Sequence, residues 1–105
     1  MAYAESLSAL ADPTRRLVFE AVASTPTSVS ALAKKLPVSR PAVSQHLKVL
    51  SDAGLVQARV DGTRRIYSVQ PQGLAELRAY LDQFWDNVLD GFAQEVQALE
   101  RSSND

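Results

Sequence analysis

The chain has 105 residues, of which 46% are hydrophobic and 22% charged, with a formal net charge of −1; these values are ordinary for one small globular domain. It contains no cysteine and one histidine, His46, which excludes disulfides, thiolate metal sites, cysteine nucleophiles and a multi-histidine metal site within one chain. No apolar run approaches the roughly 20 residues of a membrane span, and no secretory signal is visible, so we expect a cytoplasmic protein with no membrane partner.

The charges are unevenly distributed. Residues 1–27 carry a net −1, residues 28–68 carry seven bases and two acids for a net +5, and residues 69–105 carry two bases and seven acids for a net −5. A basic middle between acidic ends suggests that only the middle segment offers a surface to a polyanion. The whole-chain pI of about 5.8 argues against a protein that coats DNA regardless of sequence.

Two helices are predicted before residue 24. The first is short and amphipathic, because three apolar residues recur at helical spacing: Tyr3, Leu7 and Leu10. The second begins at Asp12-Pro13, since aspartate is a preferred N-cap and proline a preferred first residue of a helix. It is expected to run from Pro13 to about Ala23 and to bury an apolar face made of Leu17, Val18, Ala21 and Val22.

Two further helices, separated by a short turn, are predicted in the middle segment. One begins at residue 28 or 30 and ends at Pro37, because the residue before a proline is pushed out of helical conformation. Its core face is expected to be Val29, Leu32, Ala33 and Leu36. The other has Ser39 as its N-cap and runs to about Ala53, where Gly54 suits a left-handed C-terminal cap. Its core stripe is expected to be Val43, Leu47 and Leu50.

A β-hairpin is predicted after the fourth helix. Residues 55–60 and 64–69 are short segments rich in β-branched residues. Between them, Asp61-Gly62 is the strongest short-range signal of a hairpin turn. The register of the two strands stays open.

A long helix is predicted from Leu74 to about Leu99, after a break in the chain at Pro71 and Gly73. Apolar residues occupy more of its circumference than one small domain can cover, and such a stripe would be an aggregation risk if exposed. We therefore expect a homodimer joined through the first and last helices. The expected interface residues are Tyr3, Leu7, Leu81, Trp85, Val88 and Phe92. The domain is expected to span residues 1–101, followed by a disordered tail at 102–105.

The order helix, helix, tight turn, helix, hairpin matches a winged helix-turn-helix, a mostly α fold with a β-hairpin. The outer face of the fourth helix is small, polar and basic, which suits the major groove; there Gln45 can pair with adenine and Arg40 with guanine. Bases at the hairpin tip can lie on phosphates or probe the minor groove. The expected DNA-binding residues are Ser39, Arg40, Pro41, Ser44, Gln45, His46, Lys48, Arg59, Thr63, Arg64 and Arg65.

Other interpretations of these residues stay open. The middle helices can form an amphipathic hairpin with a solvated face, and arginine on a hairpin is usually edge protection against strand pairing. His46 is either a half-buried residue packed beside Leu50 or a phosphate donor. Trp85 either packs in a dimer core or lines a small-molecule pocket. No nucleophile motif or glycine-rich phosphate loop supports an enzyme, and no cofactor is expected.

Several stretches of the chain resemble the ArsR/SmtB-type transcriptional repressors. They are residues 39–50 (SRPAVSQHLKVL), residues 53–56 (AGLV), residues 62–67 and, at the start, residues 10–16 (LADPTRR). The resemblance covers about residues 5–100. It implies a homodimer of winged helices, joined by the first and last helices, that binds a double-stranded operator near its own promoter, with the half-sites in an inverted repeat.

The chain departs from the metal-sensing members of that family. Their third-helix cysteine motif falls on Ser28 and Ser30, which do not bind soft metal ions as thiolates do, and the last helix has no histidine. Asp82, Asp86 and Asp90 form a row that is usual for a solvated face, with a carboxylate metal site as the alternative. The resemblance is therefore to the non-metal branch, with no metal expected and an unknown small-molecule effector left open. A winged helix that binds another protein is the remaining rival.

Overall fold

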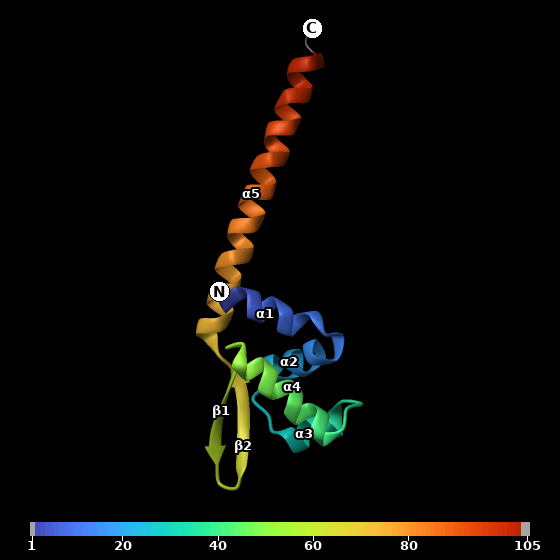
Figure 1. Ribbon diagram of the computed structural model, residues 1–105, viewed down its shortest axis with the longest axis vertical. Helices are drawn as coiled ribbons and strands as arrows, with labels where there is room; N and C mark the ends of the chain where they lie inside the picture. Colours follow the sequence, from blue (N-terminus) through green and yellow to red (C-terminus); the bar gives the residue numbers. More distant parts are fainter. Residues whose placement is uncertain (1, 104–105) are drawn as a thin grey trace.

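The computed structural model describes residues 2–103, with side chains described for residues 4–102 (Figure 1). In chain order the elements are α1 (Ala2–Ala11), α2 (Pro13–Ser24), α3 (Val29–Lys35), α4 (Arg40–Asp52), β1 (Val56–Asp61), β2 (Arg64–Val69) and α5 (Pro71–Ser103). The short helices and the hairpin form one body, and α5 leaves it as a rod. The molecule is 73 Å long but only 26 Å and 21 Å across. The predicted mostly α winged helix-turn-helix is confirmed.

Side-chain caps explain where α2, α3 and α4 begin. Asp12, Ser28 and Ser39 are in extended conformation, and each accepts a hydrogen bond from the backbone N–H three residues on, at 2.9, 3.2 and 3.3 Å. Such caps satisfy N–H groups that have no partner within the helix. The hydrogen bond from the Arg15 N–H also lowers the pKa of the Asp12 carboxyl. The predicted starts of α2 and α4 are thereby confirmed, and of the two alternatives for α3 the structure has Ser28 as the N-cap.

The core lies where α2, α3 and α4 meet the base of the hairpin. The stripe predicted for α4 is confirmed, since all three of its residues are fully buried. The prediction for Leu17 is wrong: its side chain is 46% exposed, because Val18 and Val22 face the core and Leu17 lies about 100° away from Val18 around the helix. On α3 only Leu32 is fully buried. The completely enclosed apolar side chains are Val18, Val22, Leu32, Val43, Leu47, Leu50, Leu55 and Val56.

The hairpin turn lies one residue later than its sequence signal suggests. β1 and β2 are antiparallel with Asp61 opposite Arg64, so the loop is Gly62-Thr63 rather than Asp61-Gly62. Of these two loop residues only Gly62 has a positive φ, +65°, which is the pattern of a type II′ turn with glycine at its first central position. The hairpin is tied to the body where Tyr67 and Thr27 exchange backbone hydrogen bonds of 3.0 and 2.7 Å.

The start of α5 differs from the prediction. The helix begins at Pro71, so the expected break at Pro71 and Gly73 is wrong; proline fits a first turn, whose N–H groups have no partner within the helix. Gly73 is required for another reason, because a Cβ at this position would overlap the carbonyl oxygen of Gly54. Gly54 has φ +78°, as expected of a left-handed cap. At its other end α5 continues two residues past the expected domain end, and residues 104–105 lie outside the described residues.

Beyond its first turns α5 touches little of the body. α1 packs against it, and Leu77 is buried, but Trp85 is 57% and Phe92 64% exposed. The other exposed large apolar side chains of α5 are Leu81, Phe84, Val88, Leu89, Val96 and Leu99. Neither α5 nor any other helix of the described chain combines the length and the apolar character that a bilayer crossing requires.

We expect the replacement Gly73→Ala to destabilise the fold, because the added methyl group would meet the Gly54 carbonyl and push α5 away from the end of α4. Overpacking of this kind typically costs about 1–3 kcal/mol, which urea unfolding followed by circular dichroism measures. Gly91→Ala is the matched control, since nothing lies within 4 Å of a Cβ at that position and alanine favours helix over glycine. Equal stability of the two variants would contradict the close contact.

Candidate nucleic-acid interface

A helix-turn-helix is formed by α3 and α4. The C-cap of α3 is Leu36 and the N-cap of α4 is Ser39, and the N–H of Val38 donates to the Leu36 carbonyl at 2.8 Å within the turn. α4 packs against both α2 and α3 through its buried stripe. The tight turn and this packing leave the opposite side of α4 facing outward as a rigid surface.

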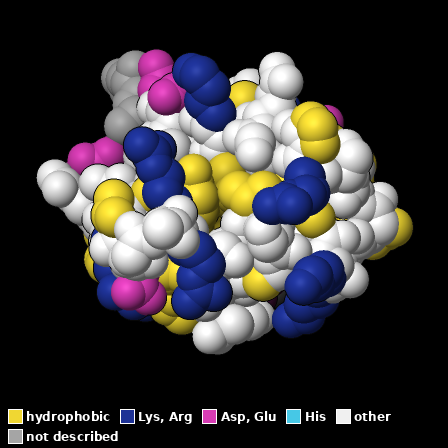
Figure 2. All heavy atoms as spheres, turned by 90° about the horizontal axis from the view of Figure 1, so that it is seen from below, with side chains coloured by type: hydrophobic (Ala, Val, Ile, Leu, Met, Phe, Trp, Pro, Cys, Tyr) yellow, Lys and Arg dark blue, Asp and Glu magenta, His cyan; other side chains and the backbone are white. Residues whose placement is uncertain are grey.

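The outer side of α4 and the hairpin hold the residues predicted to bind DNA. Those on α4 and its cap that are exposed are Ser39, Arg40, Pro41, Ser44, Gln45 and Lys48, and those on the hairpin are Arg59, Thr63, Arg64 and Arg65. Figure 2 views the end of the molecule opposite the C-terminus of α5, and Lys and Arg side chains gather there while acidic side chains lie mostly near the edge. We call this surface the basic end.

Two basic side chains on α4 have partners in the chain. Nη2 of Arg40 donates to Oγ of Ser30 on α3 at 2.6 Å, and Nζ of Lys48 lies 3.3 Å from Oδ2 of Asp52. All four side chains lie near solvent, so a phosphate can replace either partner at small cost. Sequence reasoning missed both contacts. Helical i, i+4 spacing signals the second pair, whereas the first depends on how α3 meets α4.

His46 lies beside this face and is half buried. Its Nδ1 atom is buried and has no hydrogen-bond partner among the described residues. A contact between His46 and a phosphate would therefore have to use Nε2. The half-buried position agrees with the packing interpretation of this residue, and its contact with DNA stays a prediction.

The three hairpin arginines do not share one face. Arg59 is opposite Ile66, and Asp61 is opposite Arg64; directly paired residues lie on the same side of a two-stranded sheet, and alternate residues along a strand share that side. Arg59 and Arg64 therefore lie on one side of the hairpin and Arg65 on the other. At most two of the three can rest on the same stretch of a flat partner.

The expected dimer residues lie on two packed helices. Leu7 of α1 is exposed, as are Leu81, Trp85, Val88 and Phe92 of α5, and α1 packs against α5. The side chain of Tyr3 lies outside the part of the chain whose side chains are described. In that part, no group of three or more His, Asp or Glu side chains is arranged to hold a metal ion.

The chain is similar to known transcriptional regulators. A family described as a helix-turn-helix domain matches residues 10–57. The HTH-type transcriptional regulator Rv2034 of Mycobacterium tuberculosis is 57% identical over 90 residues, which cover 86% of this chain and 84% of that protein. The nodulation protein NolR of Rhizobium meliloti is 33% identical over 97 residues, which cover 92% of this chain and 78% of NolR.

Solved structures agree with these relatives. An ArsR-like transcriptional regulator from Rhodococcus sp. RHA1 matches with a TM-score of 0.76 and 31% identity, covering 89% of this chain and 91% of that one. Mb0332 from Mycobacterium bovis, whose structure is that of a homodimeric winged helix-turn-helix DNA-binding domain, matches with a TM-score of 0.66 and 29% identity over 81% of this chain and 79% of that one. The chain belongs to the ArsR/SmtB family of helix-turn-helix transcriptional regulators.

Proposed function

We propose that this protein is a sequence-specific, cytoplasmic repressor that binds an inverted-repeat operator as a homodimer and has no catalytic role. The basic end carries the proposal, because Lys and Arg side chains gather there (Figure 2) and the residues expected to meet DNA on the outer side of α4 and on the hairpin are exposed, apart from the half-buried His46. Lys and Arg on such a surface supply affinity through the phosphates, and groove contacts by α4 supply specificity.

Within this surface the roles divide by side-chain chemistry. Gln45 reads adenine and Arg40 reads guanine, the latter by exchanging its hydrogen bond to Ser30 for one to the base. Lys48, Arg64 and Arg65 hold phosphates. The other proposed contacts are Ser39, Pro41, Ser44, His46, Arg59 and Thr63.

The proposed partner in the dimer is a second copy of the same chain. α5 has 33 residues and is therefore about 50 Å long, and its large apolar side chains are exposed along most of this length. Monomeric proteins rarely expose apolar surface of that extent. The homodimeric structure of Mb0332 supports the same arrangement here, and a two-fold dimer uses one self-complementary patch on each copy.

The regulatory signal is proposed to be something other than a thiolate-bound metal, because the chain has no cysteine. On α5, Oδ2 of Asp82 lies 3.8 Å from Nε of Arg78, and both side chains are exposed. This exposed ion pair fits the interpretation of the acidic row, Asp82, Asp86 and Asp90, as a solvated face. A small-molecule effector is the proposed alternative.

We expect Arg64→Ala to weaken binding to all DNA sequences alike, because a lost phosphate contact removes affinity but no sequence information. The slope of log affinity against log salt concentration should flatten by about one unit, whereas Gln45→Ala should cost about 1–3 kcal/mol at one operator position and relax the base preference there. Fluorescence anisotropy at several salt concentrations and selection from random DNA measure the two effects.

Arg101→Ala is the control for these variants, since Arg101 lies in the last turn of α5. This replacement should change neither the salt dependence of DNA binding nor the base preference. A change in base preference by Arg64→Ala with an unaltered salt slope would show that the roles are reversed. Failure of the unmodified protein to bind any selected DNA would favour the rival winged helix that binds another protein.

The dimer is tested by Phe92→Asp, which places a charge in the exposed apolar face of α5 and should convert a dimer to a monomer in sedimentation velocity at micromolar concentration. The body should stay folded by circular dichroism, because Phe92 is not in its core. Gln94→Asp adds the same charge about 160° away around the helix and should leave the dimer intact. A stable monomer before mutation would refute the dimer.

DNase I footprinting tests the operator geometry. A two-fold dimer presents two identical α4 helices, so the half-sites should be inverted and centred about 10 base pairs apart. The hairpins should extend the protection beyond both half-sites. Protection of a direct repeat, or of a single half-site bound as tightly as two, would contradict this geometry.

A further inference from the structure

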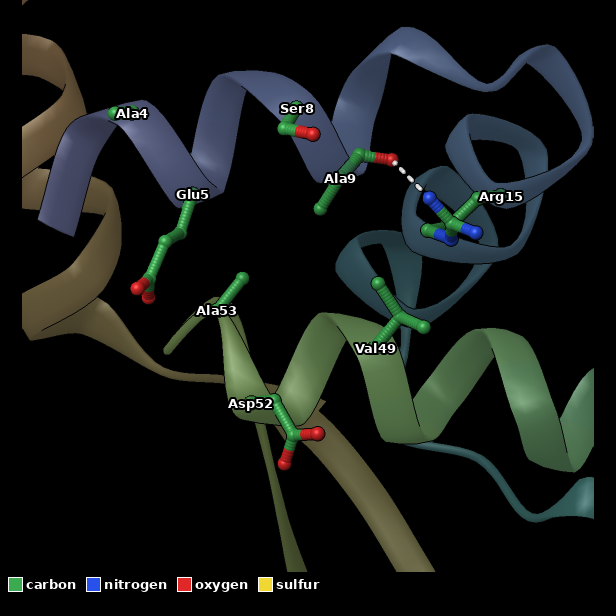
Figure 3. Close-up of a pocket in the computed structure, with 8 residues that line it drawn as sticks. All are labelled: Ala4, Glu5, Ser8, Ala9, Arg15, Val49, Asp52 and Ala53. Atoms are coloured by element: carbon green, nitrogen blue, oxygen red, sulfur yellow. Dashed lines mark hydrogen bonds between the residues drawn. The ribbon is translucent and has the colours of Figure 1, made fainter.

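A cavity of about 460 Å³ lies between α1, the start of α2 and the end of α4 (Figure 3). Its volume is in the range of small-molecule sites, about 300–1,000 Å³. The lining residues that carry the argument are Glu5, Ala9, Arg15, Val49, Asp52 and Ala53. One wall of the cavity is α1, the helix that packs against α5.

Charges of opposite sign line its two ends. Glu5 extends from α1 toward the end of α4, whereas Arg15 points from α2 into the space above Val49 (Figure 3). Nη1 of Arg15 donates to the Ala9 carbonyl at 3.3 Å, but Nε is buried with no hydrogen-bond partner among the described residues. Because Nε has no accessible surface, a ligand anion would have to meet the guanidinium through its two Nη atoms.

The spacing of the two charges defines the ligand. Glu5 and Arg15 lie on opposite sides of the cavity, with Ala9, Val49 and Ala53 between them (Figure 3), so a ligand that meets both must carry its two charges at separate ends. Between them the lining is small and apolar at Ala9, Val49 and Ala53. We propose that this cavity binds a small linear zwitterion, an ω-amino carboxylate. Its carboxylate lies on Arg15, its ammonium on Glu5 and its methylenes on the apolar lining. In an α-amino acid such as glycine the two charges are too close together to reach both ends.

The proposed dimer leaves this site accessible. Leu7, the exposed α1 residue of the proposed interface, is two positions from Glu5 and therefore about 160° away around the helix. The cavity and the interface thus use opposite flanks of α1.

The same site can influence DNA binding, a consequence that rests on the proposed function. The cavity is lined by Val49, Asp52 and Ala53 at the end of α4. Oδ2 of Asp52 forms a salt bridge of 3.3 Å with Nζ of Lys48. A ligand that ties α1 to the end of α4 therefore acts on the helix that carries the proposed base contacts. If the bound ligand changes the affinity of the protein for DNA, bound DNA must change the affinity of the protein for the ligand by the same factor.

Isothermal titration calorimetry of the full chain with 5-aminopentanoate tests the site without DNA. We expect saturable binding of 5-aminopentanoate and at least tenfold weaker binding of glycine, pentanoate and pentylamine. In the variant Glu5→Gln we expect the affinity for 5-aminopentanoate to fall at least tenfold. Glu5 is exposed, so this variant should fold normally. Glu20→Gln, on an exposed part of α2 that does not line the cavity, should bind as the unmodified chain does.

Absence of binding by 5-aminopentanoate, equal binding by pentanoate, or full binding by Glu5→Gln would each overturn the proposed site. A second titration of operator DNA with saturating 5-aminopentanoate tests the coupling, and an unchanged DNA affinity would overturn it. Loss of DNA binding with and without the compound would count against the proposed function and not against the site, which calorimetry decides separately.

Discussion

Burial of one side of α4 sets the geometry on which the other features depend. Val43, Leu47 and Leu50 have no exposed surface, and full burial of each such side chain contributes about 1.5–3 kcal/mol. α4 cannot rotate about its axis without returning these side chains to water. Its polar side is therefore held outward beside α3, with the rigidity that a surface needs to meet the edges of bases.

The end of α4, the base of the hairpin and the start of α5 meet at one point. Gly54 turns the chain out of α4 with a φ of +78°, the N–H of Gln70 donates to the Leu55 carbonyl at 2.9 Å, and Gly73 lets α5 approach the Gly54 carbonyl. α5 is thereby held in a fixed direction relative to α4. In the proposed dimer, the contact between two α5 helices would then set the separation of the two α4 helices.

The fold separates in space the charges that the chain separates in sequence. Residues 28–68 carry a net +5 and residues 69–105 a net −5. The charged residues of the second group that the structure describes lie along α5, a rod of 33 residues that points away from the basic end (Figure 1). Screening in physiological salt acts over about 8 Å, which is short compared with the length of that rod. The acidic residues of outer α5 therefore subtract little from the attraction of the basic end for a polyanion.

Features that depend on neighbours within a few residues were predictable from the sequence. The caps at Asp12 and Ser39 and the buried stripe of α4 were correct because each is a contact or a periodicity within one helix. The residues proposed to meet DNA were identified from the polar face of that helix and from the basic residues of the hairpin. The exposure of Leu17, the position of the hairpin turn, the Arg40–Ser30 hydrogen bond and the cavity beside Arg15 depend on how separate elements meet. Only the packing of the whole chain decided them, since local sequence carries no information about the angle and register at which one element rests on another.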